Sequence, residues 1–190
     1  MKSVAIIGPG DDLHRALAVA AAEAGTAVAL GTLTGQTEEF AVNSIANEVW
    51  VIGAEHFVRV MEGTEAAAVA AFGDEVADRF GACDWLVVST GQAGASHFNE
   101  CSQDEWEPGL RRHLTAPFLA TQSIGRIMER QRSGTILLVP PAEDSVLALV
   151  ARHGLEGIVA ATAAAWEDRG VIIGTASGDE AVTRLKGLAG

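Results

Sequence analysis

The sequence predicts an α/β fold in which a doubly wound parallel sheet of about six strands lies between two layers of helices. Two observations lead to this prediction. Short apolar runs bounded by turn residues alternate along the chain with helical patterns that stop at glycine, as in successive βαβ units. The run at 84–89 is apolar throughout its centre, as a parallel sheet covered on both faces requires. We expect residues 1–190 to form a single domain.

The first unit sets the pattern for the rest of the chain. The apolar run Ser3–Ile7 is followed by a Gly-Pro-Gly turn and by an alanine-rich helical pattern that stops at Gly25. The later strands are predicted at 26–30, 56–61, 84–89, 135–139 and 171–175.

Capping residues and apolar spacing predict the helices. Thr37 and Thr64 are candidate caps of the second and third helices, and Ser102 with Glu105 forms a capping box at the start of a long helix. Pro117 lies inside that long helix and should kink it. This long helix is predicted at 102–131, and two more helices are predicted at 145–168 and 179–188. Asp144 or Ser145 would cap the helix at 145–168.

Composition and charge exclude several classes of protein. The net charge of −12 opposes phosphate backbones and anionic membranes, so we expect no binding to nucleic acid or membrane. No apolar run approaches the roughly 18 residues of a bilayer span, and the N-terminal apolar run is too short for a signal peptide, which predicts a cytoplasmic protein. Cys83 and Cys101 are expected to be reduced and structural, and the five histidines have no metal-ligand spacing.

In a doubly wound sheet, ligands bind beyond the carboxyl ends of the strands. A turn starting with Gly8 and Gly10 could present backbone amides to a phosphate. Asp11 and Asp12 place negative charge at the same point, which suits the helix dipole but opposes a pyrophosphate by up to roughly 4 kcal/mol before screening. An acidic helix cap and a phosphate cradle are therefore competing interpretations of this turn.

Four blocks of the sequence resemble, in order, those of the short-chain dehydrogenases/reductases. They are 84–91 (DWLVVSTG), 103–106 with 113–118 (QDEW and HLTAPF), 133–139 (SGTILLV), and 155–157 with 167–171 (LEG and EDRGV). The resemblance implies a Rossmann-type sheet, an NAD or NADP cofactor, and a Ser-Tyr-Lys mechanism assisted by an Asn. Members of the family have a substrate lid and a seventh strand after the position of Ser177-Gly178. This sequence does not contain them, so we expect a substrate pocket to be open on one side.

On the cofactor side, the resemblance can be followed residue by residue. The family's three turn glycines match Gly8, Asp12 and His14, and His14 is expected to be a helix-surface or packing residue. The sequence Gly-Thr-Leu-Thr at 31–34 selects neither NAD nor NADP. Glu62 matches the acid on the adenine side, although a helix cap at Thr64 explains that segment equally well. The candidate cofactor-binding residues are Gly8, Gly10, Asp12, His14, Glu62 and Gly91, and we expect cofactor binding to be weak or lost.

At the positions of the family's catalytic residues, this sequence departs further from the family than it does on the cofactor side. Its Ser falls on Pro141, its Tyr on Ala148 and its Lys on Arg152, while its Asn falls on His113, for which we expect a structural role. The chain contains no tyrosine, so no shift of the alignment can supply the phenol that exchanges a proton with the carbonyl.

Three hypotheses about function follow. We favour a catalytically inactive binding or oligomerising module, forming a homodimer through the helices at 102–131 and 145–168. The alternative is an NAD(P)-dependent oxidoreductase that uses His113 as proton donor, with Arg152 and His153 nearby. A third hypothesis is cofactor-free acid/base chemistry by His113 with Glu143 or Asp144.

Overall fold

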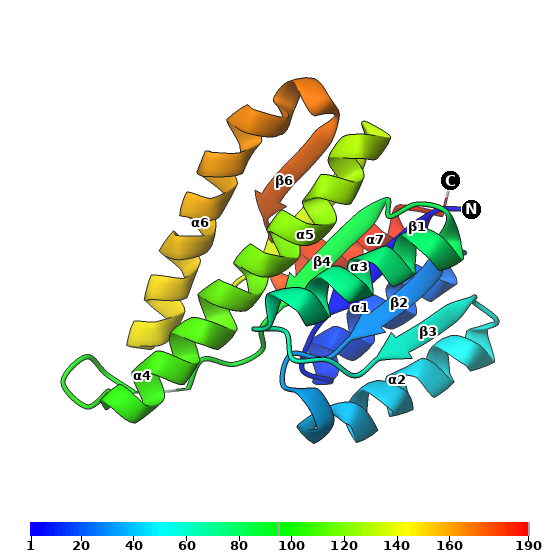
Figure 1. Cartoon of the computed structure of the whole chain (residues 1–190). Helices are drawn as coiled ribbons and strands as arrows, with labels where there is room; N and C mark the ends of the chain where they lie inside the picture. The colour runs from blue at the N-terminus through cyan, green and yellow to red at the C-terminus, as the bar shows by residue number, and fades with distance from the viewer. Residues whose placement is uncertain (95, 190) are drawn as a thin grey trace.

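The computed structural model, described here for residues 1–94 and 96–189, confirms the predicted architecture (Figure 1). Six parallel strands form one sheet in the order β3-β2-β1-β4-β5-β6. The strands are β1 (Ser3–Ile7), β2 (Ala27–Gly31), β3 (His56–Arg59), β4 (Trp85–Ser89), β5 (Gly134–Val139) and β6 (Val171–Thr175). The order reverses between β1 and β4, so the chain has the switch point at which doubly wound sheets hold their ligands.

Helices cover both faces of the sheet and make two separate cores. One face packs against α1 (Asp12–Glu23), α2 (Glu39–Ile52) and α7 (Gly178–Lys186), and the other against α3 (Ala66–Phe80), α5 (Ala116–Gln131) and α6 (Val146–Trp166). Strand residues alternate between the two cores, for example Val4 and Ile6 on one side and Ala5 and Ile7 on the other. This alternation explains why the central strands are apolar at every position.

The long helix predicted at 102–131 is interrupted before Pro117. It consists of α4 (Gln103–Leu110), a π-helical turn at Arg111–Thr115 and then α5. A proline ring clashes with the carbonyl four residues earlier, here that of His113, so the distortion falls within the turn that precedes Pro117. The capping box of Ser102 and Glu105 is present as predicted.

Two other predicted caps are wrong in detail. The Thr37 hydroxyl donates to the Thr34 carbonyl within a 3₁₀ turn (Gly35–Thr37), and α2 begins after Glu38. The Thr64 hydroxyl donates to Glu62, and Glu65 is the residue that precedes α3. Each threonine hydroxyl donates within its own loop instead of capping the next helix.

The expectation that no segment is long and apolar enough to span a bilayer is also wrong. Within the described part of the chain, α6 meets that test by length and composition. In this fold, however, it packs on the sheet core through Leu155 and runs beside α5 and β6 (Figure 1), while Leu147 and Ala148 near its start form a small separate cluster with Ala93. Its remaining apolar surface faces outward, and Ser145 caps its start by accepting from the amide of Ala148 at 3.2 Å. Its composition is that of a surface helix with a large uncovered face.

Candidate functional site

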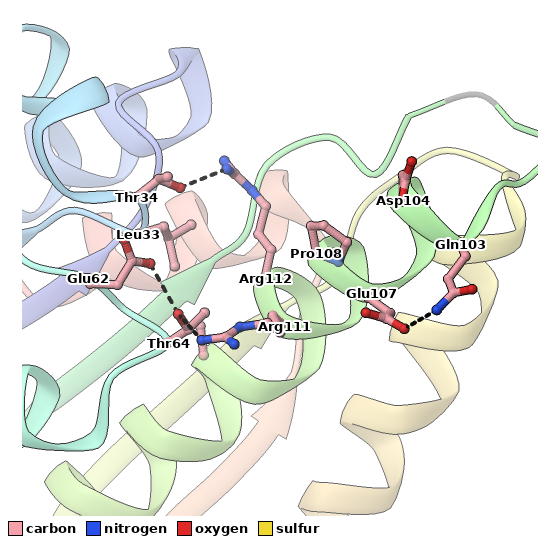
Figure 2. Close-up of a pocket in the computed structure, with 11 residues that line it drawn as sticks. Leu33, Thr34, Glu62, Thr64, Gln103, Asp104, Glu107, Pro108, Arg111 and Arg112 are labelled. Carbon is pink, nitrogen blue, oxygen red and sulfur yellow. Dashed lines mark hydrogen bonds between the residues drawn. The ribbon is translucent and has the colours of Figure 1, made fainter.

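Two cavities lie at the carboxyl edge of the sheet, where a ligand is expected. The first, which we call the acidic cleft, has a volume of about 920 Å³ and lies between the turns after β1, β4, β5 and β6. The second, the β2–β3 cavity, has a volume of about 550 Å³ and lies between the loops after β2 and β3 and the α4 helix (Figure 2). Arg112 lines both, so its side chain stands between them.

The turn after β1 bonds to itself. Asp11 caps α1 by accepting from the amide of His14 at 2.9 Å, and the amide of Gly10 donates to Nδ1 of His14 at 3.0 Å. The His14 ring is fully buried against Gly8, and burial lowers its pKa to about 4. His14 is thus a packing residue and does not lie on the helix surface. Two amides that a phosphate would need are already satisfied by side chains of this chain.

Both glycines of this turn have a local reason to be present. A Cβ on Gly8 would come within 2.7 Å of the His14 ring, and one on Gly10 would come within 2.6 Å of Ala41 on α2. Gly10 also has a φ of +81°, which favours glycine. Packing of the turn against its neighbours therefore accounts for these residues without a ligand.

The acidic cleft carries a charge that opposes a pyrophosphate. Its lining includes the guanidinium of Arg112 and the carboxylates of Asp11, Asp12, Glu143 and Asp179. At an effective dielectric near 20, each carboxylate about 4 Å from a phosphate would oppose it by roughly 4 kcal/mol before screening. The residues present therefore do not fit the diphosphate of NAD or NADP.

The turn after β4 closes onto the turn after β1. Gly91 has a φ of +71°, and a Cβ there would come within 3.0 Å of Pro9, 3.3 Å of Asp11 and 3.5 Å of Arg112. The Arg112 side chain then extends from the π-helical turn across this edge, donating from Nε to the Thr90 carbonyl at 2.8 Å and from Nη1 to Thr34 Oγ1 at 3.2 Å. Because Thr90 follows β4 and Thr34 follows β2, the guanidinium bridges the sheet edge over β1.

Glu62 lies in the β2–β3 cavity, as Figure 2 shows, and accepts from the Thr64 hydroxyl at 3.1 Å. Across the cavity, Arg111 reaches Thr64 and Glu65, each at 3.4 Å. Glu62 also pairs with Thr34 in an isolated β-bridge, which ties together the loops after β2 and β3. Its carboxylate is placed to receive a donor from a ligand in this cavity.

Three of the four positions that the resemblance matches to the family's catalytic residues are occupied by Pro141, Ala148 and Arg152. Pro141 lines the acidic cleft, while Ala148 is fully buried and presents a methyl group. Arg152 donates to the backbone carbonyl of Glu143 at 3.3 Å. A proline and an alanine have no side-chain proton to exchange, and a guanidinium stays protonated at neutral pH.

His113 is buried beneath these cavities. Its Nδ1 lies 2.7 Å from Thr90 Oγ1, and burial, followed by the nearby charge of Arg112, lowers its pKa to about 4. Neither cavity at the carboxyl edge has His113 in its described lining. In residues 1–94 and 96–189, no group of three or more His, Cys, Asp or Glu side chains is arranged to hold a metal ion.

Comparison with known proteins decides the family. The sequence model of the short chain dehydrogenases matches residues 2–176. This chain belongs to the short-chain dehydrogenase family. Among curated relatives, it is 27% identical over 190 residues to D-threitol dehydrogenase of Mycolicibacterium smegmatis, which covers 97% of this chain and 72% of that protein. It is 28% identical over 162 residues to the 3-oxoacyl-[acyl-carrier-protein] reductase FabG of Staphylococcus aureus, covering 85% of this chain and 63% of FabG.

Solved structures of short-chain dehydrogenases have the same fold. A metagenomic short-chain oxidoreductase in complex with NADP has a TM-score of 0.80 at 19% identity, over 99% of this chain and 90% of that one. NAD+-bound xylitol dehydrogenase has a TM-score of 0.83 at 21% identity, over 92% of this chain and 69% of that one. At these identities the likeness concerns the fold, and the function of this member of the family depends on its own residues.

Two residues of the site were missed from the sequence: Arg112, and the buried Glu38, whose Oε1 lies 3.4 Å from Nη2 of Arg112. Neither lies in a family motif, and each acts through contacts with segments distant in the chain. In the sequence, the adjacent basic residues Arg111 and Arg112 were a signal for Arg112. Glu38 had no comparable signal.

Proposed function

We propose that this short-chain dehydrogenase has lost hydride-transfer chemistry and works as a binding or oligomerising module. The observation that supports the proposal most is the replacement of the family's Ser and Tyr by Pro141 and Ala148, one in the cleft wall and the other fully buried. A reductase of this kind needs a group that gives a proton to the carbonyl as hydride arrives. The described lining of the acidic cleft contains no tyrosine, histidine or lysine that could take this role.

The proposed association is a homodimer through α5 and α6. These helices border a groove of about 520 Å³, which we call the α5–α6 groove. Phe118 is 46% exposed along it and Leu149 on α6 is 42% exposed, so apolar surface remains uncovered. Small exposed residues on α6, such as Gly157 and Ala161, allow a second helix to approach closely. A second copy of the chain, related by a two-fold axis, would cover this face in both subunits.

A turnover assay tests the loss of chemistry. Purified protein is mixed with NADPH or NADH and a panel of ketones and aldehydes, and in the reverse direction with NAD or NADP and a panel of alcohols. The panel includes D-threitol, because a relative is named for that substrate. We expect no cofactor consumption above a protein-free control. Turnover that scales with protein concentration would reject the proposal.

The second candidate function is an NAD(P)-dependent oxidoreductase with unusual catalytic groups. It is favoured by the match to dehydrogenases over residues 2–176 and by the size of the acidic cleft, about 920 Å³. Its proton donor would have to be His113, which is buried and bonded to Thr90. If the assay detects turnover, His113→Asn should abolish it under this second candidate.

A further inference from the structure

The loop after β2 folds around a buried carboxylate. Glu38 is only 7% exposed, and its Oε2 accepts from the amides of Leu33 at 2.6 Å and Thr34 at 2.8 Å. Its Oε1 lies 3.4 Å from Nη2 of Arg112. One anionic group is therefore held by two backbone amides and a guanidinium that comes from a distant element.

The same three donors suit a phosphate. Consecutive backbone amides that converge on one point form an anion-binding concavity, and a guanidinium adds charge-assisted hydrogen bonds to phosphate oxygens. Arg112 is already oriented, because its Nε and Nη1 bond to Thr90 and Thr34. Glu38 immediately precedes α2, whose N-terminal end adds a favourable dipole for an anion.

The backbone of this site is also held by bonds that do not involve Glu38. Gly35 donates to the Met61 carbonyl at 2.9 Å, and Gly63 donates to the Leu33 carbonyl at 2.9 Å. The Thr32 hydroxyl donates to the Met61 carbonyl at 2.6 Å. The two amides should therefore keep their positions when the carboxylate is removed.

The site also opens toward space for the rest of a ligand. Leu33, Thr34 and Arg112, which hold the carboxylate, all line the β2–β3 cavity (Figure 2). A phosphate seated in place of the carboxylate would thus lie at the edge of a cavity of about 550 Å³.

We propose that Glu38 fills, from within the chain, a binding site for a phosphate or phosphate monoester, and that removing its carboxylate opens this site. The inference deepens the proposed function and rests on it, because an internal anion at this position opposes a phosphorylated cofactor. The proposed function and this inference have separate tests. The turnover assay uses the wild-type protein, whereas the experiment below uses variants and inorganic phosphate alone.

The experiment compares Glu38→Ala with Glu39→Ala. Glu39 is the exposed neighbouring residue, so both variants lose one negative charge from the same end of α2. Thermal unfolding of each is followed in sodium phosphate and in sodium chloride at equal ionic strength and pH. We expect phosphate to raise the midpoint of Glu38→Ala by about 3 °C or more beyond its effect on Glu39→Ala. Adding Arg112→Ala to Glu38→Ala should remove this extra shift.

A second variant keeps the test decisive if Glu38→Ala does not fold in chloride. Glu38→Gln keeps the shape of the side chain and one acceptor oxygen, and phosphate should displace its neutral amide, giving a shift above that of Glu39→Ala. Folding of Glu38→Ala in phosphate but not in chloride would also support the proposal. If neither Glu38 variant responds to phosphate more than Glu39→Ala does, Glu38 is only a loop support and the proposal is wrong.

Discussion

The imidazole of His14 packs directly against Gly8, leaving no room for a side chain on that glycine. A Cβ at Gly8 would lie 2.7 Å from two atoms of a ring that is fully buried. The resemblance matches His14 to the family's third turn glycine, and the His14 ring accepts a hydrogen bond from the Gly10 amide. One substitution thus changes a turn that could face a ligand into a turn that bonds to its own helix.

This contact predicts that Gly8→Ala is destabilising. The buried His14 ring cannot swing into solvent, so the added methyl group should lower the free energy of unfolding by roughly 1 to 3 kcal/mol, as overpacking does. Urea denaturation measures the change. Gly174→Ala is the control, because a Cβ there meets nothing within 4 Å and alanine should stabilise the β6 strand by up to about 1 kcal/mol. Equal stability of Gly8→Ala and wild type would contradict the described packing.

Stability should fall as the solution becomes acidic. The pKa values of His14 and His113 are lowered from 6.5 to about 4 in the folded protein, so their contribution is complete above pH 6.5 and is lost as the pH falls toward 4. Near pH 5, each should have lost about 2 kcal/mol of unfolding free energy. Urea denaturation at neutral pH and near pH 5 measures the sum.

A variant separates the two histidines. His113→Asn removes one titrating group, so its loss of stability between neutral pH and pH 5 should be roughly half that of wild type. A pH dependence unchanged by this substitution would show that other groups control acid stability.

The cap of α1 gives a third prediction. Asp11→Ala removes the acceptor for the His14 amide and should cost about 1 kcal/mol of unfolding free energy. Asp11→Ser keeps an acceptor and removes the charge, so its stability should stay within about 0.5 kcal/mol of wild type. Thermal or urea unfolding of both variants checks this, and equal losses in the two would argue against capping as the role of Asp11.

The dimer proposal predicts that a charge in the α5–α6 groove separates the subunits. Ala161→Arg places a guanidinium on the outward face of α6, and light scattering should then give the mass of one chain, whereas wild type gives the mass of two. Asn47→Arg is the control, since it introduces the same guanidinium at an exposed position of α2 on the other side of the sheet. A monomeric wild type at micromolar concentration would reject the dimer.

The sequence predicted the six strands and the family because both depend on local patterns. Apolar runs such as that at 84–89 and a helix end at Gly25 can be recognised without knowledge of the fold. The sequence predicted a kink at Pro117 but not the π-helical turn at Arg111–Thr115, because the ring acts on a residue one turn earlier. Thr37 and Thr64 were wrong as caps because each bonds within its own loop.

The candidate site was less predictable because its contacts are distant in sequence. The Arg112 bridge depends on β2 and β4 flanking β1 in the sheet, an order that no local motif encodes. Glu38 is buried by the loop that it organises, whereas its neighbour Glu39 is exposed, and the sequence alone does not distinguish the two. The replacements at Pro141 and Ala148, by contrast, were evident from the resemblance.

The most direct test of the account is a binding titration of the wild-type protein with NADH and NADPH. Tryptophan fluorescence, including that of Trp85 on β4, and thermal stability are followed up to about 1 mM cofactor, a range that saturates most enzymes. We expect no saturable change in either signal, because the turn amides are occupied and the cleft is acidic. Saturable binding of either dinucleotide, with a rise in the unfolding midpoint, would contradict it.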